Sequence, residues 1–126
     1  KDIEAGKCVI VRRDTREKTD CKLEDVVPTV KKLMESMQSD MYTRAREYLD
    51  THISDAHDYD EFVKAVEEKP GFIRGMWCGN VECEEKIKED TTATSRCMPF
   101  EQEEIASTCV CCGKPAKKLI YWGKAY

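Results

Sequence analysis

The sequence predicts an α+β protein: one long amphipathic helix and a small three-stranded antiparallel sheet with short helices on one side. Three observations support this class. Apolar residues recur at spacings of three and four over residues 23–53, which is typical of an amphipathic helix. After residue 54 the apolar segments are short, as strands and short helices in a layered domain are. The length of 126 residues fits one domain, or one small domain plus a fragment.

The first 20 residues contain one strand-like segment. Asp2 and Gly6 interrupt the start, Cys8–Val11 is a short apolar run, and residues 12–15 form a charged turn. A single strand is not stable by itself. We therefore expect it to be the closing strand of a sheet whose other strands precede Lys1, and we assign residues 1–20 to such an upstream domain.

The long helix is the clearest element. Proline is tolerated only in the first turn of a helix, so Pro28 places the helix start near residues 25–27. From there the pattern continues for about 26 residues, or roughly 39 Å at 1.5 Å per residue. We assign residues 21–54 to this helix, which we expect to connect domains.

Residues 55–126 are expected to form a C-terminal domain. Asp58 followed by Glu61 has the spacing of a capping box, and a helix starting there would end at residues 69–71, Lys-Pro-Gly. The side chains expected on its buried face are Phe62, Val63 and Val66. The later elements are expected to be a strand at 72–77, a helix at 83–90, a strand around 95–100 and a strand at 117–122.

Charge varies along the chain. Residues 1–54 carry eleven acids and eleven bases, residues 55–104 carry fourteen acids and six bases, and residues 105–126 carry four lysines and no acid. The acidic middle argues against general nucleic-acid binding by this segment. No apolar run is long enough for a membrane span or a signal-peptide core. We therefore expect a soluble, cytoplasmic chain that does not bind a membrane.

Four of the eight cysteines form two close pairs. Cys78 and Cys83 are separated by four residues, and Cys109 and Cys112 by two. Four thiolates in two pairs suit a tetrahedral zinc ion, and a zinc with four protein ligands is structural because no position stays open for water. Gly113 favours Cys112 over Cys111 as the fourth ligand, since the residue after the second thiol often needs a positive φ.

Other interpretations of the cysteines are open. Two disulfides among the same four residues would need an oxidising compartment, and an iron–sulfur cluster usually has other spacings. No phosphate loop, nucleophile elbow or metal-hydrolase motif is present, so no catalytic residue is assigned to this chain. Neither His52 nor His57 has a cysteine at ligand spacing. The cysteines expected to be ordinary packing residues are Cys8, Cys21, Cys97 and Cys111.

Several motifs together resemble one family. They are Cys-Gly-x-x-x-Cys-Glu at 78–84 with Ile-Lys after it, Arg-Cys-Met-Pro-Phe at 96–100, Cys-x-x-Cys-Gly-Lys-Pro-Ala-Lys at 109–117, and a terminal Tyr126. In this order they resemble the C-terminal zinc-binding domain of prolyl-tRNA synthetase of the archaeal and eukaryotic type. The segments 1–4 and 11–15 resemble the closing part of the anticodon-binding domain of class II synthetases. The resemblance spans essentially the whole chain.

The resemblance implies zinc at Cys78, Cys83, Cys109 and Cys112, although a Cys-x-Cys pair in some eukaryotic members would select Cys111 instead. It also implies a class II ligase that activates proline with ATP and magnesium and transfers it to tRNA(Pro). The sites for ATP, magnesium and proline would lie in a catalytic domain that precedes Lys1 and also forms a homodimer. Most of the anticodon-reading surface would also precede Lys1. This fragment would give structural support to those domains.

The terminal residue has an implied role of its own. In the family the terminal tyrosine reaches back toward the catalytic domain, so the resemblance implies that the carboxylate of Tyr126 approaches the active site. Two rival hypotheses remain. One is a free-standing zinc-binding module that mediates protein interactions, and the other is a secreted disulfide protein.

Overall fold

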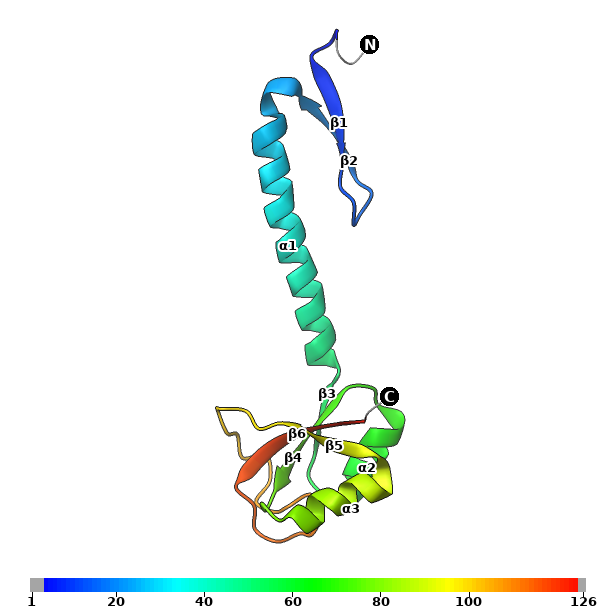
Figure 1. Cartoon of the computed structure of the whole chain (residues 1–126), viewed down its shortest axis with the longest axis vertical. Helices are drawn as coiled ribbons and strands as arrows, with labels where there is room; N and C mark the ends of the chain where they lie inside the picture. The colour runs from blue at the N-terminus through cyan, green and yellow to red at the C-terminus, as the bar shows by residue number, and fades with distance from the viewer. Residues whose placement is uncertain (1–3, 125–126) are drawn as a thin grey trace. The chain divides into compact units, whose positions relative to one another are not determined.

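The structure is a computed structural model that describes residues 4–124 (Figure 1). It divides into two compact units, Lys1–Glu47 and Tyr48–Tyr126, and the division falls within the long helix. Within residues 4–124, no helix combines the length and the apolar character that crossing a membrane requires.

The first unit begins with a hairpin. Strand β1, Lys7–Val11, pairs antiparallel with β2, Lys18–Lys22, and the Arg12 N–H closes the connection by donating to the Glu17 carbonyl at 2.9 Å. The prediction that residues 1–20 hold one strand without a local partner was therefore wrong. β2 has the sequence Lys-Thr-Asp-Cys-Lys with only Cys21 buried, so no apolar alternation marks it.

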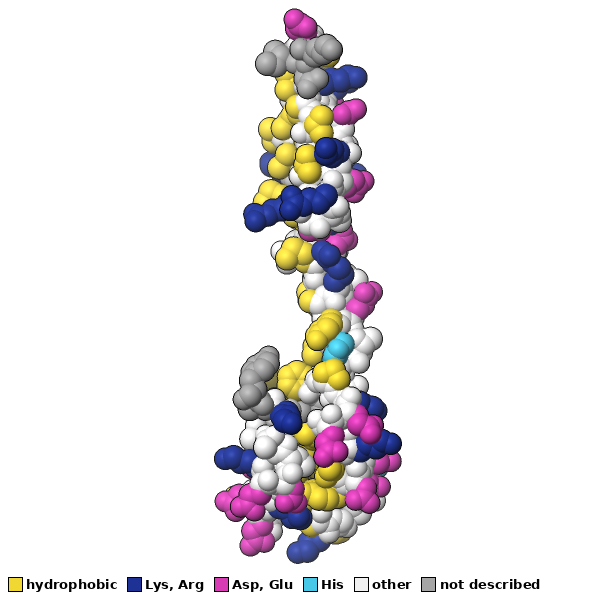
Figure 2. Space-filling view, turned by 90° about the vertical axis from the view of Figure 1, so that its right-hand side faces the viewer, with side chains coloured by type: hydrophobic (Ala, Val, Ile, Leu, Met, Phe, Trp, Pro, Cys, Tyr) yellow, Lys and Arg dark blue, Asp and Glu magenta, His cyan; other side chains and the backbone are white. Residues whose placement is uncertain are grey.

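The long helix is confirmed. A short 3-10 turn, η1, Leu23–Asp25, leads into α1, Val26–Thr51, which has the expected 26 residues with Pro28 in its first turn. α1 has no buried residue, and Figure 2 shows hydrophobic side chains exposed along it. Charged side chains join the hairpin to this helix. Arg12 pairs with Asp40, and Asp14 pairs with Arg44 at 3.2 Å.

The second unit is built on a four-stranded mixed sheet. The strands and helices of this unit that follow α1 are β3 Ile53–Ala56, α2 Tyr59–Glu68, β4 Phe72–Trp77, α3 Val81–Thr91, β5 Ala93–Cys97 and β6 Lys118–Lys124. The strand order is β3-β4-β6-β5, with β3 parallel to β4 and the other neighbours antiparallel. The α+β class is confirmed, but the expected three-stranded antiparallel sheet was wrong. The missed strand is β3, and α2 is the crossover between β3 and β4.

β3 was missed because it is short and follows a helix. Ile53 continues the spacing of the helix, and the remaining residues, Ser-Asp-Ala, lack an apolar pattern. Its pairing begins where the Phe72 N–H donates to the His52 carbonyl at 2.8 Å. Gly71 has a φ of +120° there, and a Cβ at this position would lie 2.0 Å from the His52 oxygen. Only glycine fits this approach.

The predicted cap of α2 is confirmed, and its buried face is partly confirmed. The Asp58 side chain accepts from the Glu61 N–H at 2.9 Å. Phe62 is buried as expected, whereas Ala65 takes the place beside it and the predicted Val63 and Val66 are only half-buried. The core against the sheet contains Phe62, Ile73, Ile87, Val110 and Trp122, with Phe62 and Trp122 edge to face at 5.9 Å.

Candidate metal centre

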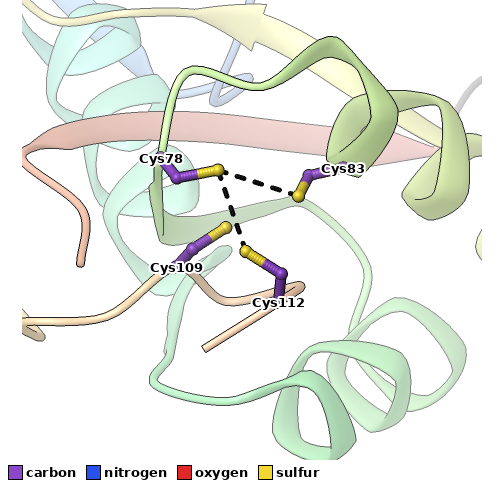
Figure 3. Close-up of side chains that lie close together, drawn as sticks. All are labelled: Cys78, Cys83, Cys109 and Cys112. Atoms are coloured by element: carbon purple, nitrogen blue, oxygen red, sulfur yellow. Dashed lines mark hydrogen bonds between the residues drawn. The ribbon is translucent and has the colours of Figure 1, made fainter. Parts of the chain in front are cut away.

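The structure brings four thiols into one cluster. The Sγ atoms of Cys78, Cys83, Cys109 and Cys112 all lie within 4.8 Å of one another. Cys78 follows β4 and Cys83 lies in the first turn of α3, while the other two come from the loop before β6 (Figure 3). The Cys78–Cys83 sulfur distance is 3.7 Å and the Cys112–Cys78 distance is 3.8 Å. Such a group can hold one metal ion.

A tight turn positions the first pair. Gly79 has a φ of +91°, and the Asn80 side chain caps α3 by accepting from the Glu82 N–H at 3.2 Å. The Asn80 carbonyl accepts from the Cys83 N–H and, at 3.1 Å, from the indole N–H of Trp77. The turn is thus held at both ends, which directs the sulfurs of both cysteines to the same side.

Backbone hydrogen bonds position the second pair. The Cys109 N–H donates to the Lys114 carbonyl at 2.7 Å, and the Gly113 N–H donates to the Cys109 carbonyl at 2.9 Å. Gly113 has a φ of +69°, as the sequence predicted for the residue after the second thiol. The Val110 N–H donates to the Met76 carbonyl at 2.8 Å and so fixes the loop to β4.

The environments of the four sulfurs differ. Burial raises the pKa of the Cys83 thiol well above its ordinary value, and neighbouring thiols raise it further. Burial also raises the pKa of Cys109, although backbone N–H groups of Cys112, Cys111 and Cys78 donate to its sulfur and partly offset this. The exposed Cys112 has its pKa lowered to about 7, mainly because the Lys114 N–H donates to its sulfur.

These shifts bear on whether the four sulfurs can be charged together. Four thiolates this close would repel one another, and two of the four sulfurs are buried. Donor N–H groups favour the charged form of Cys109 and Cys112, but they cannot neutralise four negative charges. A divalent ion among the sulfurs would neutralise two of these charges and offset the repulsion.

The other predicted site residues lie elsewhere. The neighbouring Cys111 is half-buried and lies outside the group of four. His57 pairs with Glu61 at 2.8 Å, and His52 stacks on Tyr48 with ring centroids 3.9 Å apart. Tyr126 lies outside the described residues.

Sequence reasoning missed two features. The first is the set of backbone N–H donors around the sulfurs of Cys109 and Cys112. In the sequence, only the Cys-x-x-Cys-Gly spacing could have indicated these donors. The second is the pairing of Cys8 with Cys21 across β1 and β2, which depends on the strand that was missed. Cys97, at the end of β5, is exposed.

Comparison with known proteins finds one family and similar relatives that share its name. The family described as prolyl-tRNA synthetase, C-terminal, matches residues 59–126. The chain is similar to proline–tRNA ligases of Agathobacter rectalis (62% identical over 127 residues), Lachnoclostridium phytofermentans (57% over 126) and Clostridium botulinum strain Loch Maree (52% over 126). Each match covers 100% of this chain and 26% of the relative, so the chain spans about a quarter of their length. The chain belongs to the prolyl-tRNA synthetase C-terminal family.

Proposed function

We propose that this chain is the C-terminal part of a class II proline–tRNA ligase, which activates proline with ATP and attaches it to tRNA(Pro). The observation that supports this most strongly is 62% identity to a proline–tRNA ligase along the whole chain. The part proposed for the chain is structural. It supports the catalytic and anticodon-binding domains and contributes no catalytic residue of its own.

We propose that the cluster of Cys78, Cys83, Cys109 and Cys112 binds one structural zinc ion per chain. Zinc–sulfur bonds of about 2.3 Å in a regular tetrahedron give sulfur–sulfur edges of about 3.8 Å. The Cys78–Cys83 and Cys78–Cys112 sulfur distances, 3.7 and 3.8 Å, agree with that edge. An all-sulfur set of four favours zinc over magnesium or calcium, which prefer oxygen.

The same geometry disfavours the other interpretations of the cysteines. Sulfurs in a disulfide lie at about 2.05 Å, much closer than these. In an iron–sulfur cluster the thiolates bind different irons, whereas here the four sulfurs converge on the space of one ion. A free-standing zinc module would also contain such a cluster, but it would not account for relatives that extend about four times the length of this chain.

The remaining partners follow from the proposed activity. ATP, magnesium, proline and the catalytic residues belong to the part of the relatives that this chain does not match. The proposed partners are tRNA(Pro), the catalytic domain of the same chain and a second copy through that domain, in the cytoplasm. Residues 1–20 would close the anticodon-binding domain, residues 21–54 would connect it, and residues 55–126 would form the zinc-binding domain.

Two finer proposals rest on the motifs alone. The Cys-Gly-x-x-x-Cys and Cys-x-x-Cys-Gly pattern supports the archaeal and eukaryotic type of the enzyme, whereas the relatives named above are bacterial. We also propose that the carboxylate of Tyr126 approaches the active site in the full-length enzyme. Adding a C-terminal tag after Tyr126 should then slow aminoacylation and leave the zinc content unchanged. An unchanged rate in the tagged enzyme would count against this role.

The main proposal has a direct test. The full-length protein should exchange pyrophosphate into ATP only when proline is present, and it should charge tRNA(Pro). The isolated chain should do neither, and metal analysis should find one zinc in each. A full-length protein that is active with another amino acid would refute the assignment. The structural role would be refuted if the isolated chain showed pyrophosphate exchange that rose with its concentration and persisted after repurification.

A further inference from the structure

We propose that Cys8 and Cys21 are a thiol pair that forms a reversible disulfide across the hairpin. The two residues lie directly opposite each other in the antiparallel register of β1 and β2. This inference concerns the first unit and does not depend on the zinc site or on the proposed enzyme activity.

The backbone hydrogen bonds define the separation of the pair. The Leu23 N–H donates to the Gly6 carbonyl at 3.0 Å, and bonded pairs alternate along an antiparallel ladder. Two residues further along each strand, Cys8 and Cys21 therefore form a hydrogen-bonded pair with a Cα separation of about 5.5 Å. Disulfides span Cα separations of about 4.4–6.8 Å, so the Cα spacing of this pair lies within that range. The Cβ atoms of a hydrogen-bonded pair lie about 5.5 Å apart, so closing the bond requires the two strands to approach by about 1 Å, to the Cβ separation of about 3.5–4.5 Å in a disulfide.

The side chains also meet. Directly opposed residues of an antiparallel pair point to the same face of the sheet. The Cys21 Sγ lies 3.5 Å from the Thr29 hydroxyl oxygen of α1, so this face points toward the helix. Burial raises the pKa of the Cys8 thiol, and the nearby Cys21 raises it further, as expected for two thiols on the same face of the hairpin.

Accessibility gives the two thiols different roles. Cys8 is half-buried, whereas Cys21 is only 6% exposed. A small disulfide can therefore reach Cys8 first. The Cys8 thiolate attacks one sulfur of glutathione disulfide, which forms a mixed disulfide and releases one glutathione thiolate. The Cys21 thiolate then attacks the Cys8 sulfur and releases the second glutathione. Both protons lost by the cysteines end on the two glutathione molecules, and two electrons pass from the pair to glutathione disulfide.

A Cys8–Cys21 disulfide would change the first unit at the hairpin and at its contact with Thr29 of α1. It would close the segment between Cys8 and Cys21 covalently, and it would remove the Cys21 thiol hydrogen that the Thr29 hydroxyl accepts. The raised pKa of Cys8 lowers its thiolate fraction at neutral pH, so the reaction should be slow compared with that of an ordinary exposed thiol.

The test is a redox titration of the zinc-loaded full chain with glutathione disulfide, followed by alkylation of free thiols, tryptic digestion and mass spectrometry. The expected product is peptide 8–12 linked to peptide 19–22, lost again on reduction, without glutathione on Cys8. Cys97 is the internal control, because it is exposed and its register partner is Tyr121, so it should stop at the mixed disulfide. In a Cys21→Ser chain, Cys8 should also stop there.

Two results would overturn the proposal. One is glutathione on Cys97 while peptides 8–12 and 19–22 remain unlinked and alkylated. The other is a stable mixed disulfide on Cys8 in the unsubstituted chain, which would show that Cys21 cannot reach it.

Discussion

Replacing Cys112 with serine should weaken zinc binding about 100-fold, whereas Cys111→Ser should change it by no more than a few-fold. Structural zinc sites bind with about 10–16 kcal/mol, or roughly 3 kcal/mol for each of four thiolates. A serine hydroxyl stays protonated at neutral pH and does not replace a thiolate. About 1.4 kcal/mol is tenfold in affinity, so the loss of one thiolate corresponds to about two orders of magnitude.

The comparison with Cys111 is matched, because the two residues are adjacent and receive the same substitution. Cys111 is half-buried and lies outside the group of four, so Cys111→Ser removes a packed sulfur and no ligand. The Lys114 N–H, which lowers the pKa of Cys112 to about 7, donates to the Cys112 sulfur and favours its thiolate. The substitutions therefore differ mainly in their effect on the metal.

The assay is a competition titration in which a coloured chelator of known zinc affinity removes the ion from each variant at pH 7. Circular dichroism of the zinc-loaded variants should be unchanged, which separates loss of a ligand from loss of fold. A larger loss for Cys111→Ser would assign the fourth ligand to Cys111 and refute the reasoning from Gly113. Equal, moderate losses would show that the two neighbours exchange at the metal.

Three further predictions concern stability and pH. Gly71→Ala should destabilise the chain by about 2–4 kcal/mol, because the added Cβ would lie 2.0 Å from the His52 oxygen. Gly113→Ala places its Cβ in open space and should cost only about 1–2 kcal/mol of left-handed backbone strain. Urea unfolding of the zinc-loaded variants measures both losses of stability, and a larger loss for Gly113→Ala would contradict this prediction. The carboxyl of Asp14 should titrate near pH 2 by NMR, because hydrogen bonds from Arg12 lower its pKa to about 2. The stability that this carboxylate contributes should therefore be complete above about pH 4 and lost as the pH falls toward 2. An unchanged titration midpoint in Arg12→Ala would show that Arg12 does not lower this pKa. Chelation of zinc should abolish the near-ultraviolet dichroism of the second unit and leave much of the helical signal, and retention of both signals would show that its fold does not need the metal.

The elements that the sequence predicted well are those with a local signal. The limits of α1 follow from Pro28 and from a periodicity that lasts seven turns. β4 begins after Gly71 and contains two aromatic residues and one β-branched residue among its six. The cap of α2 depends on two residues three positions apart. In each case the interactions that define the element lie within a few residues of it.

The elements that were missed are defined by pairing partners. β2 is polar, and its place is fixed by the register with β1. β3 has four residues, and its parallel pairing with β4 forms only after α2 has crossed over. Neither partner can be read from the segment itself, so a periodicity argument assigns such segments to a helix end or a loop.

The site was predictable to a similar extent. Two cysteine pairs with adjacent glycines indicated which thiols could meet, and the structure does bring those four together. Their different environments could not be predicted, because the burial of Cys83 and Cys109 depends on packing against β4 and β6. The amide donors to Cys109 depend on the conformation of a loop that the spacing alone does not define.

The position of the cluster explains why a metal would matter for this fold. Two of the four cysteines are themselves core residues of a hydrophobic cluster, whose members are Met76, Cys83, Cys109, Ala116 and Leu119. Residues 98–117, between β5 and β6, contain no strand or helix apart from one isolated bridge between Thr108 and Pro115. A segment of this length has a considerable entropic cost of ordering, and few backbone hydrogen bonds offset it. An ion shared by Cys78, Cys83, Cys109 and Cys112 would fix this segment to the start of α3 and to β4. Without the ion, the same buried sulfurs would be mutually repelling or protonated thiols in the core, so this segment should be the first part of the second unit to open.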